Sequence, residues 1–135
     1  MYILDTNIIS EFMAPIVDLR FAKWIEKVQG IELGTCSICV FEIEKGIALL
    51  PKGKRAETLR INFDKFLASL VVVDFDTSCA ESSARLFAFR QLSGFNPKVE
   101  DMMIAGICAT NGAVLITRNV KDFEGLPIEV VNPWI

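Results

Sequence analysis

The 135-residue chain contains no histidine. This absence excludes a Ser-His-Asp or Cys-His catalytic set, a histidine proton shuttle and every zinc site that needs a histidine ligand. Positive charge is also scarce, because 14 basic residues stand against 17 acidic ones, for a net charge of −3. Such a balance argues against indiscriminate nucleic-acid binding, since phosphate neutralisation requires clustered lysine and arginine. Any chemistry must therefore use carboxylates, lysines, hydroxyls or thiols.

Long apolar segments and a secretion signal are missing as well. The longest uncharged run, residues 102–117, has 16 residues and includes two glycines, a threonine and an asparagine before its last residue. A membrane span needs about 20 mainly apolar residues. The first residues lack the basic region and apolar stretch of a signal peptide. We therefore expect a cytoplasmic protein with no membrane contact, and the length predicts a single domain over residues 1–135.

The four cysteines lie among apolar or small neighbours, at Cys36, Cys39, Cys79 and Cys108. This setting favours reduced, buried thiols over a secreted disulfide framework. Cys36 and Cys39 have the spacing of a redox or metal motif, but one such pair cannot complete a tetrahedral zinc site. We interpret them as core packing.

Short β-branched runs alternate with longer apolar segments at helical spacing, which is typical of a parallel sheet covered by helices. We expect strands at residues 2–4, 32–36, 71–75, 113–117 and 128–131. We expect helices from near residue 8 and at 18–28, 37–50, 54–69, 77–92 and 99–111, with Ser37 as a cap. The fold prediction is a single α/β domain whose central, mainly parallel sheet has about five strands. The carboxyl ends of such strands share one edge, where open α/β sheets bind ligands.

Four acidic residues are placed at that edge or near it. Asp5 ends the first expected strand, Asp122 follows the fourth, Asp101 lies in the first turn of the last long helix, and Glu42 has apolar neighbours early in another helix. Asp5 could instead only cap a helix, and Asp101 could only complement a helix dipole. Glu100 is the competitor of Asp101, which we prefer because it lies on the helical row that packs onto the sheet.

Gathering these acids has an electrostatic cost. Two carboxylates about 5 Å apart repel by roughly 3 kcal/mol at an effective dielectric constant near 20. A cluster would therefore hold protons or bind a cation, and hard oxygen ligands at a hydrated site suit Mg²⁺ or Mn²⁺. Such an ion can activate water and neutralise charge on a phosphodiester without histidine.

Two further patterns point to contact surfaces. Residues 52–65 include five basic and two acidic side chains, which indicates either a solvated helix face or a rim that contacts phosphates. In the helix at 18–28, Phe21 and Trp24 widen the apolar stripe beyond one core face. That excess indicates a second contact, with either the core or a partner.

The order and spacing of several short motifs resemble those of PIN-domain ribonuclease toxins of the VapC/FitB type. The similar motifs span essentially the whole chain and are Asp5-Thr6-Asn7, Glu42 with Gly46, Asp101-x-x-Ile104-Ala105, Thr117-Arg118-Asn119 with Asp122-Phe123, and Asn132-Pro133-Trp134. The resemblance implies an endoribonuclease dependent on Mg²⁺ or Mn²⁺. In it, Asp5, Glu42 and Asp101 correspond to the core acids and Asp122 to a more variable fourth acid. Thr6 and Asn119 correspond to polar supports of the metal site.

The resemblance also implies partners, namely an RNA substrate, a second copy in a homodimer, and a cognate VapB/FitA-like antitoxin, with which a larger assembly could form. We expect RNA phosphates to contact Arg118, Lys121, Lys52, Lys54 and Arg55. We expect the antitoxin groove, if it is not ordinary core or dimer packing, at Phe12, Met13, Phe21 and Trp24.

One departure from similar proteins is Gly106, where they often carry alanine. We expect this glycine to loosen its helix, at a cost of about 1 kcal/mol.

Two alternative functions remain open. A receiver-type phosphoacceptor domain is also α/β and Mg²⁺-binding, but it needs adjacent acids after the first strand, where this chain has Asp5-Thr6-Asn7. A catalytically idle module that binds RNA or a protein would keep the fold without metal chemistry.

Overall fold

A five-stranded parallel sheet forms the centre of the computed structural model, which describes residues 1–135. The strands are β1 (Tyr2–Leu4), β2 (Leu33–Cys36), β3 (Val71–Val73), β4 (Val114–Ile116) and β5 (Val130–Val131). Their order is β3-β2-β1-β4-β5, and every neighbouring pair is parallel. The predicted fold class is confirmed, although most of the strands are shorter than expected.

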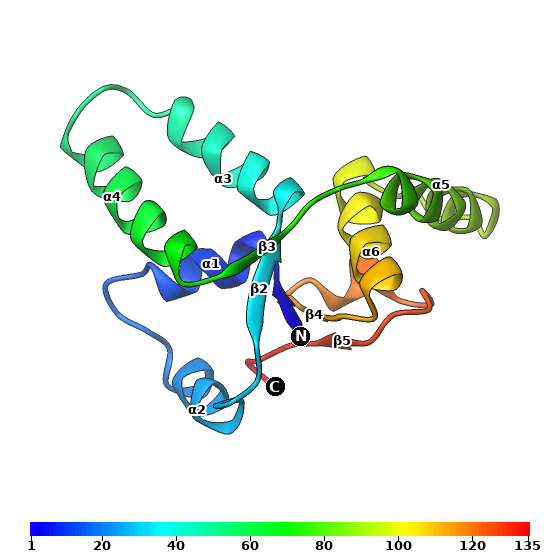
Figure 1. Cartoon of the computed structure of the whole chain (residues 1–135), viewed down its shortest axis with the longest axis horizontal. Coiled ribbons are helices and arrows are strands. Elements are labelled where there is room, and N and C mark those ends of the chain that lie inside the picture. The colour runs from blue at the N-terminus through cyan, green and yellow to red at the C-terminus, as the bar shows by residue number, and fades with distance from the viewer.

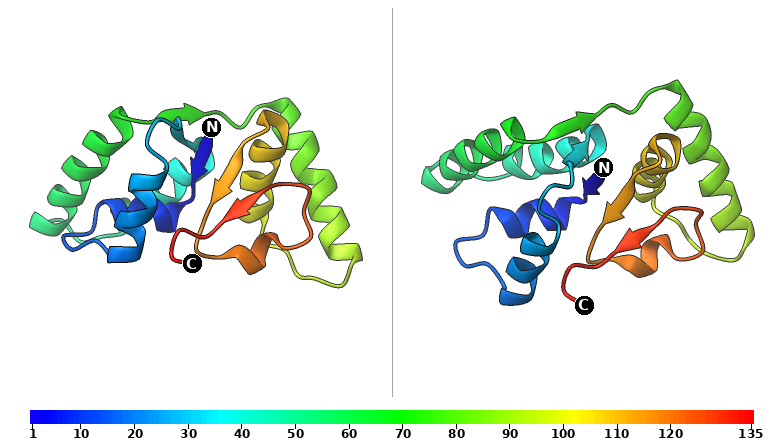
Figure 2. Two further views of the ribbon diagram at one scale, coloured as in Figure 1. Left: turned by 90° about the horizontal axis from the view of Figure 1, so that it is seen from below. Right: turned by 60° about the horizontal axis from the view of Figure 1, so that its bottom comes forward.

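Six α-helices and one short 3₁₀ helix connect the strands (Figure 1). They are α1 (Thr6–Phe12), α2 (Leu19–Lys27), α3 (Ser37–Ala48), α4 (Lys54–Ala68), α5 (Thr77–Leu92), α6 (Val99–Asn111) and η1 (Val120–Phe123). In Figures 1 and 2, α3 and α4 run together on one side of the sheet, and α5 and α6 lie on the other. None of the helices is both long and apolar enough to cross a membrane.

Local sequence signals explain several of the helix ends. The Asp18 and Asp76 side chains accept hydrogen bonds from backbone N–H groups in the first turns of α2 and α5. Gly112 ends α6 in the left-handed region, with φ of 60°. The expected cap at Ser37 is wrong, because Cys36 occupies the cap position without a side-chain hydrogen bond. The Ser37 hydroxyl instead accepts a hydrogen bond from Phe75 N at 3.0 Å and so joins α3 to the segment after β3.

The core is built around β1 and β4, whose Ile3, Leu4, Leu115 and Ile116 are fully buried. Beside it, α5 and α6 make an unusually close contact at Gly106. A Cβ atom at this position would lie 1.9 Å from Ser83 Oγ and 2.9 Å from the Cys79 carbonyl oxygen. The glycine is therefore required for helix packing, which corrects the expectation that it only loosens its helix.

Candidate active site

The buried carboxylate of Asp5 is the best-anchored acid at the carboxyl edge of the sheet. Asp5 is only 6% exposed, and it caps α1 by accepting a hydrogen bond from Thr6 N at 2.8 Å. The same Oδ1 accepts from Cys39 Sγ at 3.8 Å. Its Oδ2 accepts from Thr117 Oγ1 at 2.7 Å and from Asn7 Nδ2 at 3.3 Å. Four donors thus fix the orientation of this carboxylate.

The same network ties the end of β1 to the loop after β4. Thr117 Oγ1 donates to Asp5 and accepts from Asn7 Nδ2 at 3.3 Å and from Asn119 N at 3.1 Å. Asn7 Oδ1 in turn accepts from Arg118 N at 3.0 Å. The loop that leads to Asp122 is therefore held in register with Asp5.

Glu42 reaches the same edge from α3. Thr6 Oγ1 donates a hydrogen bond to Glu42 Oε1 at 3.1 Å. Burial raises the pKa of Glu42, the Thr6 hydrogen bond opposes that rise, and the charges of Asp5 and Glu100 add to it. Glu44, two residues on, pairs instead with Arg60 of α4, so it belongs to the contact between α3 and α4.

Asp101 completes the group from the first turn of α6. Burial, together with the charges of Asp122 and Asp5, raises its pKa to about 6, while Lys98 acts in the opposite direction. These causes show that the acids act on one another electrostatically. The shift lies in the direction expected for carboxylates forced into proximity.

All four predicted acids line one pocket of about 300 Å³ that has no apolar lining residue. Asp5, Glu42, Asp101 and Asp122 come from the end of β1, from α3, from α6 and from η1. The predicted supports Thr6 and Asn119 line the same pocket. The structure therefore brings together residues that are up to 117 positions apart in the sequence.

The donor set fits a hard divalent cation. Carboxylate oxygens dominate the lining of the pocket, and the raised pKa values of Glu42 and Asp101 reflect burial and negative charge that a bound cation would offset. One ligand atom from each of Asp5, Cys39 and Glu42 also lies within 4.8 Å of the other two. This acidic cluster is suited to divalent-metal chemistry.

Several residues of the site lie outside the set that the sequence predicted. Lys98 lines the pocket, and so does Glu100, the competitor of Asp101, although Glu100 is exposed, as its place off the buried row of α6 implies. Cys39 is buried, as expected, but it also donates to Asp5. Its position three residues before Glu42 places both on one helical face, and that spacing could have identified it.

Only some of the basic residues predicted to contact RNA line hollows next to the acidic pocket. A second hollow shares Thr6 and Glu42 with the acidic pocket and is also lined by Arg55. Lys54 and Arg55 line the next hollow along α4. Lys52 and Lys121 are exposed but line none of these hollows. The Arg118 guanidinium is stacked 3.7 Å from the centroid of the Trp134 ring.

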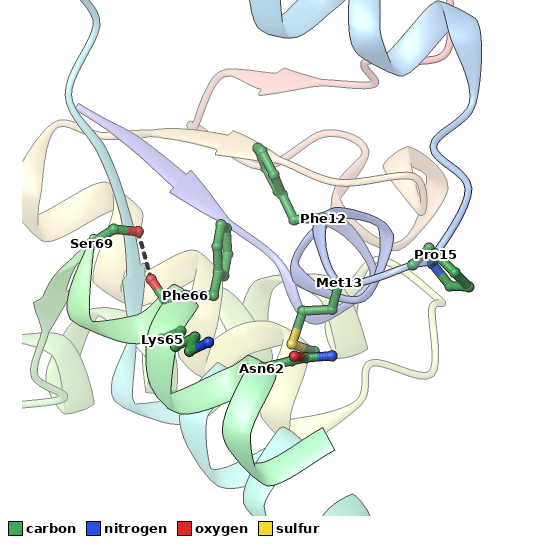
Figure 3. A pocket seen from close by; sticks show the side chains of 8 residues that line it. Phe12, Met13, Pro15, Asn62, Lys65, Phe66 and Ser69 are labelled. Atoms are coloured by element: carbon green, nitrogen blue, oxygen red, sulfur yellow. Dashed lines mark hydrogen bonds between the residues drawn. The ribbon is translucent and has the colours of Figure 1, made fainter. Parts of the chain in front are cut away.

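The four aromatic and apolar residues expected in an antitoxin groove divide into two groups. Phe12 and Met13 line a hollow of about 510 Å³ beside α4 (Figure 3). Phe21 is fully buried, with ring centroids 5.0 Å from Phe12 and 5.1 Å from Trp134. Its assignment to a surface groove is wrong, because this ring belongs to the core. Trp24 is half-buried and stacks on Phe21 at 6.0 Å.

Comparison with known proteins gives consistent matches. The PIN domain family model matches residues 2–127. The plasmid stability protein StbB of Pseudomonas syringae pv. tomato is 37% identical, with 99% of each chain covered. The VapC ribonuclease Y4jK of Sinorhizobium fredii is 31% identical, with 99% of this chain and 98% of the relative covered. The crystal structure of FitAcB from Neisseria gonorrhoeae includes a chain with a TM-score of 0.88 and 27% identity, with 99% of each chain covered.

Proposed function

The chain belongs to the PIN domain family and, within it, to the VapC-type toxins, and we propose that it is a metal-dependent endoribonuclease that serves as the toxin of a toxin–antitoxin pair. One observation carries this proposal: four carboxylates from separate elements line a single pocket with no apolar residue. Family membership also argues against the receiver-type alternative. We propose that the protein acts on RNA in the cytoplasm.

Asp5, Glu42, Asp101 and Asp122 would hold Mg²⁺ or Mn²⁺. When bound, such an ion lowers the pKa of a coordinated water and neutralises charge that develops on a phosphodiester. The protein contributes orientation, since Thr117 and Asn7 fix the Asp5 carboxylate. Thr6 holds the Glu42 carboxylate by its hydroxyl hydrogen bond.

The basic residues next to the pocket support an RNA substrate. Arg55 borders a hollow that shares two residues with the acidic pocket, and Lys54, the residue before it, lines the next hollow along α4. These cations would hold phosphates that flank the cleaved bond. Arg118 and Lys121, which neighbour the pocket residues Asn119 and Asp122 in the sequence, would contact further phosphates. Because the whole chain is acidic, this local positive charge is what would favour RNA.

The antitoxin is the protein partner in this proposal. The solved relatives include FitAB bound to an IR36 DNA fragment and VapBC2 from Rickettsia felis bound to a promoter DNA fragment. In this chain, the hollow with Phe12 and Met13 at one end of the basic stretch would accept an apolar segment of an antitoxin. A homodimer, and a larger complex with the antitoxin, complete the proposed assembly.

Cleavage of a structured RNA by the purified protein tests the proposal. We expect cleavage with Mn²⁺ or Mg²⁺ and none with EDTA. In Asp101→Asn the cleavage rate should fall at least a hundredfold, because the change removes a residue that acts directly on the ion. Asp74→Asn is the matched control, because Asp74 is exposed and lies outside the pocket. Cleavage that survives EDTA or the Asp101 change would contradict the mechanism.

Calorimetric titration with Mn²⁺ separates the enzyme from a catalytically idle module. An enzyme with a working site binds the ion in the wild-type protein and binds it more weakly in Asp101→Asn. An idle module shows no binding that depends on these carboxylates.

A further inference from the structure

Arg90, near the end of α5, is an arginine that the fold buries. It is 5% exposed, although arginine is almost never fully buried unless it is paired. Its Nη1 donates to the carbonyl oxygen of Glu124, and its Nη2 donates to the carbonyl oxygen of Asp122 at 3.4 Å. Its guanidinium carbon lies 3.9 Å from the centroid of the Phe95 ring. The guanidinium is therefore enclosed between an aromatic face and the backbone of one turn.

No carboxylate neutralises this buried charge. The ion pairs of the structure join Arg20 to Asp18 and Arg60 to Glu44 and Asp64, and none involves Arg90. Burying a charge is costly unless hydrogen bonds or an opposite charge compensate it, and an apolar side chain would fill the same space at lower cost. What distinguishes Arg90 from an apolar side chain is that its guanidinium donates hydrogen bonds to two backbone carbonyl groups.

Those two carbonyls belong to the turn that carries Asp122. The turn is short, since η1 has four residues and its internal hydrogen bonds join Asp122 N to Asn119 O and Glu124 N to Lys121 O. At its beginning, Asn119 N is held by Thr117 Oγ1. Arg90 holds the other end from a different element, so the turn is fixed on both sides of the acid that lines the pocket.

We propose that Arg90 is a positioning residue that clamps the Asp122 and Glu124 carbonyls and so fixes η1 with the Asp122 carboxylate in the acidic pocket. This inference rests on the proposed function, because the position of Asp122 matters most if the pocket holds a cation. Arg90 does not line the pocket, so it acts on the site only through the turn. Loss of the clamp would let Asp122 leave its place without changing Asp5, Glu42 or Asp101.

The test is a double-mutant cycle in which Mn²⁺ alone is titrated into the purified protein by calorimetry. We expect Arg90→Met to weaken Mn²⁺ binding about tenfold, the lower end of what loss of an outer partner of a metal ligand costs. In an Asp122→Asn background, the same change should add less than about twofold, because the carboxylate that Arg90 positions is already gone. The matched control is Arg85→Met, since Arg85 is an exposed arginine on the same helix.

An equal effect of Arg90→Met in both backgrounds, or none in either, would overturn the proposal and leave Arg90 a packing role only. Unchanged Mn²⁺ binding in Asp122→Asn would overturn it too, since Asp122 would then have nothing to hold. If Arg90→Met does not fold, Arg90→Lys carries the same cycle, because lysine keeps the charge but cannot span both carbonyls.

A second measurement separates this proposal from the proposed function. If the wild-type protein binds no Mn²⁺, the metal-dependent function fails, and amide hydrogen exchange in residues 119–125 then decides about Arg90. Faster exchange there in Arg90→Met than in Arg85→Met supports the clamp. Equal exchange in the two variants overturns it.

Discussion

Replacement of Asp101 by asparagine should stabilise the metal-free protein at neutral pH. The pKa of Asp101 in the folded protein is about 6, chiefly because of burial and also because of the neighbouring acids, against a usual value of 3.8. A shift of this size corresponds to about 3 kcal/mol at about 1.4 kcal/mol per pKa unit. Because the side chain is half-buried and lines an open pocket, solvent screening reduces this figure to about 1.5 kcal/mol.

The direction with pH follows from which state binds more protons. Between pH 4 and pH 6 the folded protein holds a proton on Asp101 that the unfolded chain has released, so the stability that Asp101 contributes falls as pH rises through this window. Asparagine cannot ionise. The stability difference between variant and wild type should therefore be near zero at pH 4 and reach about 1.5 kcal/mol above pH 7.

Urea unfolding in EDTA, at several pH values from 4 to 8, measures this difference. The gain corresponds to a rise of about 5 °C in melting temperature for a domain of this size. Saturating Mn²⁺ should reverse the order, because the wild-type protein binds the ion more tightly and gains more from it. Asp74→Asn should show neither effect. An Asp101→Asn variant that is no more stable than wild type at pH 7.5 in EDTA, or whose advantage does not shrink toward pH 4, would refute the reasoning.

Three further changes test other parts of the structure. Asp5→Asn should abolish Mn²⁺-dependent cleavage and, unlike the Asp101 change, lower the free energy of unfolding by about 1–3 kcal/mol. The asparagine amide has one acceptor oxygen and one NH₂ donor, so it cannot accept all four hydrogen bonds that the carboxylate accepts, including that from Thr117. A variant as stable as wild type in urea would contradict this. Gly106→Ala should destabilise the fold by about 1–3 kcal/mol despite the better helix propensity of alanine. Adding Ser83→Gly should recover part of this loss, which urea unfolding of the double variant measures. Full stability of the single variant would disprove the close contact. Arg55→Ala should weaken binding of all RNA sequences alike and reduce the salt dependence of the binding constant by about one released counterion. Fluorescence anisotropy of labelled RNA in EDTA measures both effects. A change limited to one sequence would argue for base recognition instead.

The sheet and the helices could be predicted because their signals are local. Apolar periodicity indicated α5 and α6 with the bounds that the structure has, and β-branched runs indicated every strand. The strand ends were less well predicted, because β5 comprises only Val130–Val131 whereas the apolar run begins at Ile128. Pairing with a neighbouring strand, which the pattern of one segment does not encode, decides where a strand stops.

The acidic pocket was predicted in outline for a different reason. Once the strands are parallel, right-handed connections place the residues after β1 and β4 at the same edge of the sheet. The pairing of β1 with β4 in the structure then brings Asp5 and Asp122 into one pocket. The exposed or buried state of a side chain follows no such rule. Phe21 and Trp24 have the same helical pattern, yet Phe21 is enclosed by Phe12 and Trp134 from distant segments.

By itself, the sequence determined the parallel α/β domain, the four acids of the edge and the exclusion of histidine chemistry, because composition, periodicity and strand ends are properties of single segments. Only the tertiary structure decided that Cys39 donates to Asp5, that Gly106 must leave room for Ser83, and that Arg90 holds the turn of Asp122. The physical reason is that these are contacts between side chains and backbone far apart in the chain. Their energies depend on distances of a few ångströms, which packing sets and no local pattern specifies.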